Sequence, residues 1–350
     1  MLLLLAIPAA LLARWYGLDG VWQFLLSIVA LLPLASLMGE STEELAARAG
    51  SIVGGLMNAT FGNAAELLIA FFALQAGKIN VVKASIAGSL LANLLFVLGI
   101  SIFVGGVKHH RQSFNKQAAG LLATLLTLSL LAYILPTLFD MAQRTYYGIT
   151  NPITSDNKYS LIVAAVLIAV YLANLLFSLV THRDMLIGSA EKEETRWTTA
   201  YSLGVLLIST VGVALMAEIM VANLEEATRQ LGLTEFFVGI VILPVVGNVA
   251  EQFAAVKFAI VNKMDLSVQI AVGSSLQIAL LMAPLLVVTG SLIGRPFNLV
   301  FLNPLVLTAL VAAIFIVNAV VKDGETHWLE GVMLLGVYAL LTFAFFFAPH

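Results

Sequence analysis

The sequence predicts an all-α integral membrane protein of about eleven transmembrane helices, and its composition and its run of long apolar segments lead to this fold class. Of its 350 residues, 61% are hydrophobic and only 11% are charged, whereas soluble domains carry about 25% charged residues. Apolar segments close to the ~20 residues that cross a bilayer as a helix follow one another along the whole chain. They lack the strict alternation of polar and apolar residues that is typical of membrane β-barrel strands.

Short polar or Gly/Pro breaks separate these segments, which define the predicted helices in order. The first resembles a secretory signal peptide, but it has no basic n-region, and Trp15 and Tyr16 are typical of a membrane interface. We therefore expect a retained span. The predicted helices cover residues 2–16, 21–45, 52–76, 80–106, 117–139, 158–181, 198–225, 235–261, 266–290, 299–321 and 327–348.

The most charged loop lies between the sixth and seventh predicted helices. It contains Glu191, Glu193 and Glu194, and we expect an acidic cytoplasmic linker at 182–197. The alternative to a solvated linker is a segment that collects cations or regulates the protein. Ten of the 17 Lys and Arg residues fall on the side of the membrane that holds the N-terminus, three of them in the loop 108–116. This bias predicts a cytoplasmic N-terminus.

Composition also excludes several classes of partner and site. A net charge of −3 argues against nucleic acid as a partner. The absence of cysteine excludes disulfides and thiolate metal or redox sites. We expect the lipid bilayer as partner and no resident cofactor, and a homo-oligomer stays open.

A 32-residue motif occurs twice. "GNAAELLIAFFALQAGKINVVKASIAGSLLAN" begins at Gly62, "GNVAEQFAAVKFAIVNKMDLSVQIAVGSSLQI" begins at Gly247, and a constant offset of 185 aligns them without a gap. We interpret this as a duplication. The copies begin in the third and eighth predicted helices, so an odd number of crossings separates them and the second copy is predicted to be inverted. Inverted repeats build the midplane sites of secondary transporters. The identical pairs include Gly62/Gly247, Asn63/Asn248, Ala65/Ala250, Glu66/Glu251, Lys78/Lys263, Gly88/Gly273, Ser89/Ser274 and Leu91/Leu276.

Each copy carries its polar residues on one helical face. Glu66 follows Asn63 by three positions, as Glu251 follows Asn248, and residues three apart share a helix face. Placing a charged carboxylate near the bilayer centre costs at least ~2.5 kcal/mol of free energy. We therefore expect the polar faces of four helices to meet at a common point. The other polar residues of this set are Ser89, Asn93, Ser274 and Gln277.

A hard divalent cation fits these side chains. Ca2+ takes about 6–8 oxygen ligands from carboxylates, amides, backbone carbonyls and water. Glu66 and Glu251 would supply the charge, and the amide and hydroxyl groups of the set are candidate neutral ligands. Zinc or copper favours His or Cys, and His109–His110 lies in a basic loop instead. A structural salt bridge from Glu251 to Lys257 is disfavoured because six residues place the two on different helix faces. Residues expected to loosen the helices and free backbone carbonyls are Gly62, Gly247 and Pro244.

Two carboxylates also suggest how transport is coupled. A site that holds one divalent cation or two protons is neutral, and the empty, doubly ionised site is not. If only neutral forms move, cation and proton transport become an obligatory exchange. Glu43 and Glu218 are candidate vestibule residues that relay ions, although solvation of a helix end explains the first of them nearly as well.

These residues resemble a known family. "NATFGNAAELLIAFFAL" with "AGSLLANLLFVLG", and "VVGNVAEQFAA" with "AVGSSLQIALLMAP", are similar to the two signature repeats of the cation/proton exchanger (CAX) family, the Ca2+/H+ antiporters of the Ca2+/cation antiporter superfamily. The resemblance implies one leading helix (1–17) and two inverted five-helix repeats (18–181 and 198–350).

The resemblance also implies a role for particular residues. Glu66 and Glu251 would bind Ca2+ and H+ in turn, while Glu43 and Glu218 match acidic positions of the family. The short length resembles prokaryotic members, which export Ca2+ from the cytosol across the plasma membrane. The short acidic segment and Lys257 depart from the family pattern and affect regulation more than transport. The neutral residues expected to assist are Asn63, Asn248, Ser89, Ser274 and Gln277.

Three other functions are weighed against this one. A sodium/calcium exchanger of the same fold would need further oxygen ligands for sodium, and the polar faces offer few. A passive cation channel usually obtains its symmetry from subunits rather than from a repeat. An intramembrane enzyme would need an Asp-rich, His-Glu-x-x-His or nucleophile motif, which we do not find, so we expect no enzyme.

Overall fold

The computed structural model describes residues 2–182 and 195–348. They form two compact units, and each unit takes segments from both predicted repeats. Unit 1 combines Met1–Ser85, Leu175–Glu251 and Phe345–His350, and unit 2 combines Ile86–Asn174 and Gln252–Ala344. The sequence predicts a division of the chain into two consecutive repeats. These compact units do not test that division, which stays a prediction.

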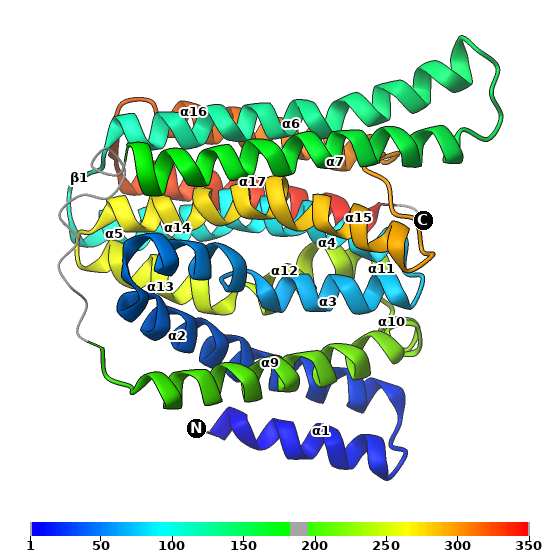
Figure 1. Ribbon diagram of the computed structural model, residues 1–350, viewed down its shortest axis with the longest axis horizontal. Helices are drawn as coiled ribbons and strands as arrows, with labels where there is room; N and C mark the ends of the chain where they lie inside the picture. The colour runs from blue at the N-terminus through cyan, green and yellow to red at the C-terminus, as the bar shows by residue number, and fades with distance from the viewer. Residues whose placement is uncertain (1, 183–194, 349–350) are drawn as a thin grey trace. The chain divides into compact units, whose positions relative to one another are not determined.

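Unit 1 is built on the long helix α2, with α1 and α9 packed along it (Figure 1). The side chain of Asp19 caps α2 by accepting from the Val21 amide at 3.0 Å, and Thr198 caps α9 in the same manner. A kink at Gly50 (φ 78°, ψ 168°) divides α2. The elements of unit 1 are η1 Leu2–Leu5, α1 Ala6–Trp15, α2 Gly20–Phe61, α3 Ala64–Gln75, η3 Phe177–Thr181, α9 Thr199–Ala222, α10 Leu224–Leu231, α11 Glu235–Phe237, η4 Val238–Ile242 and α12 Leu243–Gly247.

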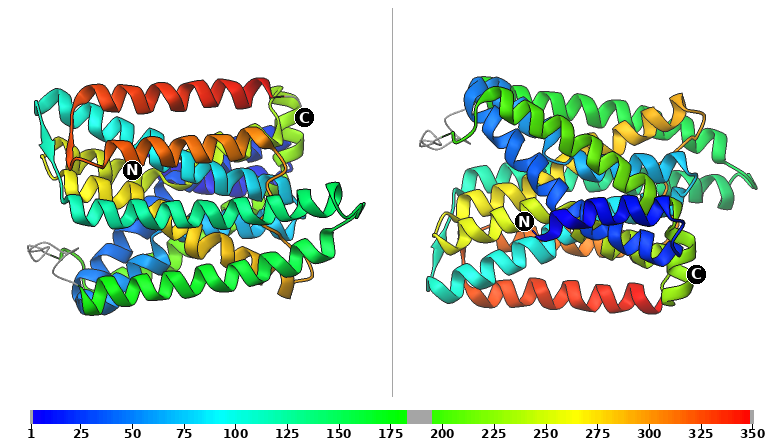
Figure 2. Two further views of the ribbon diagram at one scale, coloured as in Figure 1. Left: turned by 90° about the horizontal axis from the view of Figure 1, so that it is seen from above. Right: turned by 90° about the horizontal axis from the view of Figure 1, so that it is seen from below.

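Unit 2 packs α14 against α5, α6 and the π-helical segment η2. Its helix α16 runs beside α6 (Figure 2). The helices α5 and α17 approach closely, because an added Cβ on Gly106 would lie 2.5 Å from the Trp328 amide nitrogen. The sequence ranges of helices α4, α7, α13 and α17 each include residues assigned to both units. The remaining elements are α4 Ile79–Leu91, η2 Ala92–Val97, α5 Leu98–Lys108, β1 Gln112–Ser113, α6 Lys116–Thr145, α7 Ile153–Leu176, α13 Val249–Ile260, α14 Met264–Gln277, η5 Ile278–Met282, α15 Ala283–Leu292, α16 Pro304–Val320, β2 Glu325–Thr326 and α17 Trp328–Phe347.

The predicted fold class is confirmed as a helical membrane protein. Within the described residues, seven helices are long and apolar enough to cross a membrane, or up to eight if a helix pair bent by 110° counts as one span. Three shorter apolar helices accompany them, and each of the eleven predicted segments contains helix. The count of eleven crossings and the inversion stay predictions. The antiparallel pair β1–β2 was not predicted, because two residues per strand leave no periodic signal.

The duplicated motif repeats in the backbone as well as in the sequence. Gly77 and Asn262, 185 positions apart, both adopt positive φ (76° and 60°). Each ends its helix with the same hydrogen bonds: Lys78 N donates to Ala73 O, and Lys263 N donates to Phe258 O. The π-helical segments Ala92–Val97 and Ile278–Met282 end 185 positions apart. Local backbone geometry therefore supports the duplication.

Candidate cation site

Both copies of the motif break the helix at the asparagine. Asn63 (φ −103°, ψ 24°) separates α2 from α3, and Asn248 (φ −87°, ψ 13°) separates α12 from α13. Gly62, directly before the first break, keeps helical angles (φ −54°, ψ −47°). The backbone therefore leaves the helix one residue after the glycine. The loosening of the helices by Gly62 and Gly247 during transport stays a prediction.

The break in the second copy has its own hydrogen bonds. Pro244, near the start of α12, offers a carbonyl that accepts from the backbone amide of Asn248 at 3.1 Å and from its side-chain Nδ2 at 2.9 Å. Asn248 is 1% exposed. With Nδ2 engaged, the side-chain oxygen is left to face other groups. Pro244 thus fixes the orientation of the asparagine.

Glu66 lies in the first turn of α3 and packs against the second copy of the motif within unit 1. An added Cβ on Gly247 would lie 2.9 Å from Cγ of Glu66 and 3.5 Å from its Oε1. The two residues touch because position 247 has no side chain. The sequence placed Gly247 at the site as a helix-loosening residue, and the structure adds this packing contact.

The carboxylate of Glu66 is buried and incompletely satisfied. The side chain is 6% exposed, and among the described residues its Oε2 has no hydrogen-bond partner. Buried polar atoms nearly always have a partner, and exceptions call for an explanation. A bound cation or a proton would supply what this oxygen lacks.

The other predicted residues fall into both units. Asn63 (6% exposed) and the half-buried Glu251 belong to unit 1 with Glu66. Within unit 1, α3 of the first copy packs on α12 of the second, and within unit 2, α14 packs on η2. Each unit therefore joins a polar segment of one copy to a polar segment of the other. The predicted residues in unit 2 are the buried Ser89, Asn93 and Ser274 and the half-buried Gln277.

Two of the four π-helical segments among the described residues, η2 and η5, lie next to predicted ligands. Asn93 is the second residue of η2, and Gln277 directly precedes η5. Single π-helical turns within α-helices frequently occur at functional sites. A sequence gives no clear signal for them, so these two segments were missed.

The acidic residues predicted for a vestibule have different surroundings. Arg14 of α1 donates from Nη2 to Oε1 of Glu218 at 3.0 Å, and both side chains are about half exposed. Glu43 is exposed, while its neighbour Glu44 accepts from the backbone amides of Arg196 and Trp197. Glu218 thus has a partner from the leading helix that the sequence did not suggest.

The acidic residues of the linker, Glu191, Glu193 and Glu194, lie outside the described residues.

Lys78, which corresponds to Lys263 in the second copy of the motif, forms ion pairs with two glutamates. Nζ of Lys78 lies 2.6 Å from Oε1 of Glu235 and 3.0 Å from Oε2 of Glu225. Partial burial alone would lower the pKa of Lys78, but the hydrogen bonds and charges of the two glutamates outweigh it and raise this pKa. The lysine therefore ties the turn between α3 and α4 to α10 and α11.

The helical membrane fold, the duplicated break and the buried acid define a class of protein, the multi-pass membrane ion exchangers. A model of the sodium/calcium exchanger protein family matches residues 20–180 and 201–347. The chain belongs to this family, and its resemblance to the cation/proton exchangers is confirmed.

Three relatives illustrate the similarity. The Ca(2+)/H(+) antiporter of Aphanothece halophytica is 44% identical over 99% of this chain and 96% of its own length. The vacuolar calcium ion transporter of Schizosaccharomyces pombe is 36% identical over 100% of this chain and 85% of its own. The solved structure of native YfkE superimposes with a TM-score of 0.86 at 35% identity, with 99% of each chain covered.

Proposed function

We propose that this protein is a secondary transporter that exchanges Ca2+ for H+ across a membrane. Relatives named as Ca(2+)/H(+) antiporters match it over nearly its full length, which supports both substrates. The transported Ca2+ is a substrate here and not a resident cofactor. The alternative, a sodium/calcium exchanger, is not favoured, and a requirement for Na+ in the flux would reverse that choice.

Glu66 is the residue that carries the mechanistic proposal. Its Oε2 is buried without a hydrogen-bond partner among the described residues, beside Gly247. A carboxylate held in this way binds either a proton or a cation strongly, because burial penalises a bare charge. We assign Glu251, its counterpart in the second copy, the same role.

Two glutamates account for the coupling. One divalent cation or two protons neutralise the pair, and the empty pair carries two charges in a poorly hydrated place. Ca2+ and protons therefore compete for the pair, and the protein alternates access to either face with one or the other bound. The asparagines at the breaks are proposed as neutral ligands. The further roles of Ser89, Ser274, Gln277 and Asn93 rest on the sequence and stay predictions.

Cellular placement is part of the proposal. We infer a multi-pass protein of the cell membrane with a cytoplasmic N-terminus that exports Ca2+ from the cytosol. The relatives include both bacterial antiporters and a vacuolar transporter. The test is therefore to find which cellular membrane contains the protein. A homo-oligomer stays a prediction.

Flux through proteoliposomes tests the exchange and the site together. A proton gradient should drive Ca2+ uptake in the parent protein, and uptake should move protons in the opposite direction. Glu66→Gln and Glu251→Gln should each reduce exchange on the order of a hundredfold, because the neutral amide can neither release a proton nor balance the charge of the cation. The control is Glu40→Gln, an exposed residue of α2, which should exchange like the parent.

Two results would count against the proposal. Normal exchange by both glutamine variants would remove Glu66 and Glu251 from the site. Uptake that is independent of a proton gradient, or that requires Na+, would overturn the coupling ion while leaving the fold unaffected.

A further inference from the structure

The π-helical segment η5 leaves one backbone carbonyl without a donor from its own helix. The amide of Ala283 donates to the carbonyl of Ile278, five residues back, which is the π-helical pattern. In an α-helix the same amide would donate to Ala279, four residues back. The following amide could serve Ala279 in the π-helical pattern, but residue 284 is proline and has no N–H. The Ala279 carbonyl therefore needs a donor from another element.

Tyr133 of α6 supplies this donor. Its hydroxyl donates to the carbonyl oxygen of Ala279 at 2.9 Å. Tyr133 is 1% exposed and Ala279 is 0% exposed, and buried backbone carbonyls nearly always have a hydrogen-bond partner. Both residues belong to unit 2. The tyrosine hydroxyl thus completes the hydrogen bonding of η5 from outside the helix.

The first copy of the motif contains the same turn without the proline. The amide of Leu98 donates to the carbonyl of Asn93, five residues back, and both positions precede the corresponding pair of the second copy by 185. The residue that follows Leu98 is Gly99, which has an N–H, whereas the second copy has Pro284 at this place. The need for a donor from α6 therefore arises from Pro284.

Neighbouring groups fix the ring of Tyr133. The ring meets that of Phe301 edge to face, with the centroids 5.7 Å apart. The amide of Phe301 donates to the hydroxyl of Thr137, one turn farther along α6, at 3.0 Å. The aromatic contact and this hydrogen bond keep the tyrosine in one orientation.

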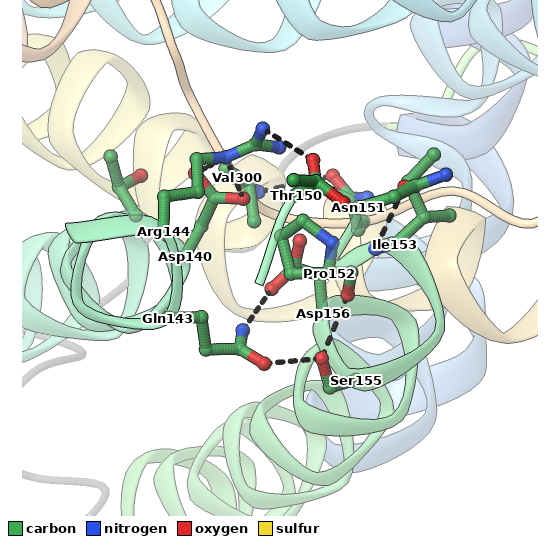
Figure 3. A network of polar contacts seen from close by, with 12 residues as sticks. Asp140, Gln143, Arg144, Thr150, Asn151, Pro152, Ile153, Ser155, Asp156 and Val300 are labelled. Carbon is green, nitrogen blue, oxygen red and sulfur yellow. Dashed lines mark hydrogen bonds and ion pairs between the residues drawn. The ribbon is translucent and has the colours of Figure 1, made fainter. Parts of the chain in front are cut away.

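A network of polar contacts fixes the end of α6 (Figure 3). Nε of Arg144 donates to both carboxylate oxygens of Asp140 at 2.9 Å. Nε2 of Gln143 donates to Oδ1 of Asp156 on α7 at 2.9 Å, and Oε1 of Gln143 accepts from the hydroxyl of Ser155. These contacts join α6 to α7, and they limit the movement of the helix that carries Tyr133.

The π-helical turn sets the orientation of Gln277, which directly precedes it. A π-helical turn inserts one residue, so it rotates the preceding helix relative to the following one by about 100°, the rotation of one helical residue. Without the tyrosine hydroxyl, the Ala279 carbonyl would be a buried acceptor without a partner, which is costly. The Ala283 amide can satisfy this carbonyl only by leaving that of Ile278, which converts the turn into α-helix. Gln277 would then point in another direction.

We propose that Tyr133 is a positioning residue for cation binding: its hydroxyl holds the π-helical turn η5, and the turn orients Gln277. This role rests on the proposed exchange function, in which Gln277 is a predicted neutral ligand. Tyr133 itself touches no cation in this role. It acts through the backbone of η5 alone.

Thermal unfolding in detergent tests the hydrogen bond without any need for transport. Tyr133→Phe should lower the Tm by a few degrees, because it leaves the buried Ala279 carbonyl without a donor. Pro284→Ala restores an amide five residues after Ala279, so adding it to Tyr133→Phe should recover most of the lost Tm. The matched control is Tyr159→Phe, which removes a hydroxyl that forms no hydrogen bond among the described residues and should keep the parent Tm.

Ca2+ titration of proton-driven uptake in proteoliposomes, well below the Tm, tests the positioning. Tyr133→Phe should raise the Ca2+ concentration for half-maximal uptake on the order of tenfold, because binding depends on sub-ångström placement of the ligands. The maximal rate should change much less, and Pro284→Ala should restore the half-maximal concentration. In a Gln277→Ala background, Tyr133→Phe should cause no further loss, because both changes act on one ligand.

Different results separate the parts of this proposal. If Pro284→Ala fails to recover the Tm of Tyr133→Phe, the hydrogen bond does not hold the turn. The positioning role is refuted if Tyr133→Phe lowers the Tm but leaves the half-maximal Ca2+ concentration unchanged, or if it causes the same loss in the Gln277→Ala background. A parent protein that does not exchange Ca2+ for protons would refute the proposed function and this role together, and the Tm comparison would still decide the hydrogen bond.

Discussion

At Gly247 the absence of a side chain decides where Glu66 can lie. The gap between Cγ of Glu66 and an added Cβ would be 2.9 Å, shorter than ordinary van der Waals contact between carbon atoms. The glutamate and the glycine belong to different copies of the motif, so each copy shapes the surroundings of the other's residues.

Gly247→Ala should therefore displace the Glu66 carboxylate. We expect the apparent affinity for Ca2+ to fall on the order of tenfold, since binding sites depend on sub-ångström placement of their ligands. Transport titrations with Ca2+ in proteoliposomes would measure this change. Gly120→Ala is the matched control, because an added Cβ on this α6 glycine meets no atom within 4 Å. An unchanged affinity in Gly247→Ala would show that the close approach has no bearing on binding.

At the scale of the element, α2 shows how one residue shapes a long helix. The helix covers 42 residues, and Gly50 interrupts it with φ 78° and ψ 168°, a region that is essentially restricted to glycine. The kink lies between the second and third predicted spans, so it marks the point where one apolar segment gives way to the next.

Gly50→Ala should strain this kink and destabilise the protein by about 1–3 kcal/mol. Thermal unfolding in detergent would detect the loss as a lower Tm. Gly204→Ala, in the second turn of α9, provides the contrast, because its surroundings are open and alanine is the better helix former by about 1 kcal/mol. Equal Tm values for the two variants would contradict a role for the glycine conformation.

At the scale of the whole molecule, the sequence predicts much of the fold because the signals are long or repeated. Apolar segments predict the helices, and a gapless offset identifies the duplicated motif. The positions of the breaks at Asn63 and Asn248 were not predicted, because a glycine beside an asparagine does not reveal which of them leaves the helix. The pairing of Arg14 with Glu218 joins residues 204 positions apart, and no local pattern reports such a contact.

The predicted orientation in the membrane is testable at this scale. Single cysteines at Ser113 and Tyr147 lie in successive loops of the cysteine-free chain, and both positions are exposed. With a cytoplasmic N-terminus, a membrane-impermeant thiol reagent should label Tyr147→Cys in intact cells and Ser113→Cys after permeabilisation. The reverse pattern would place the N-terminus outside.

The mixed origin of the two units has a consequence for how such a molecule can evolve. Each compact unit draws chain from both copies of the duplicated motif, and Glu66 from one copy rests on Gly247 from the other. Neither consecutive half of the chain forms one of these compact units by itself, so we expect neither copy to fold as a separate module. A substitution in one copy changes the constraints on its sister.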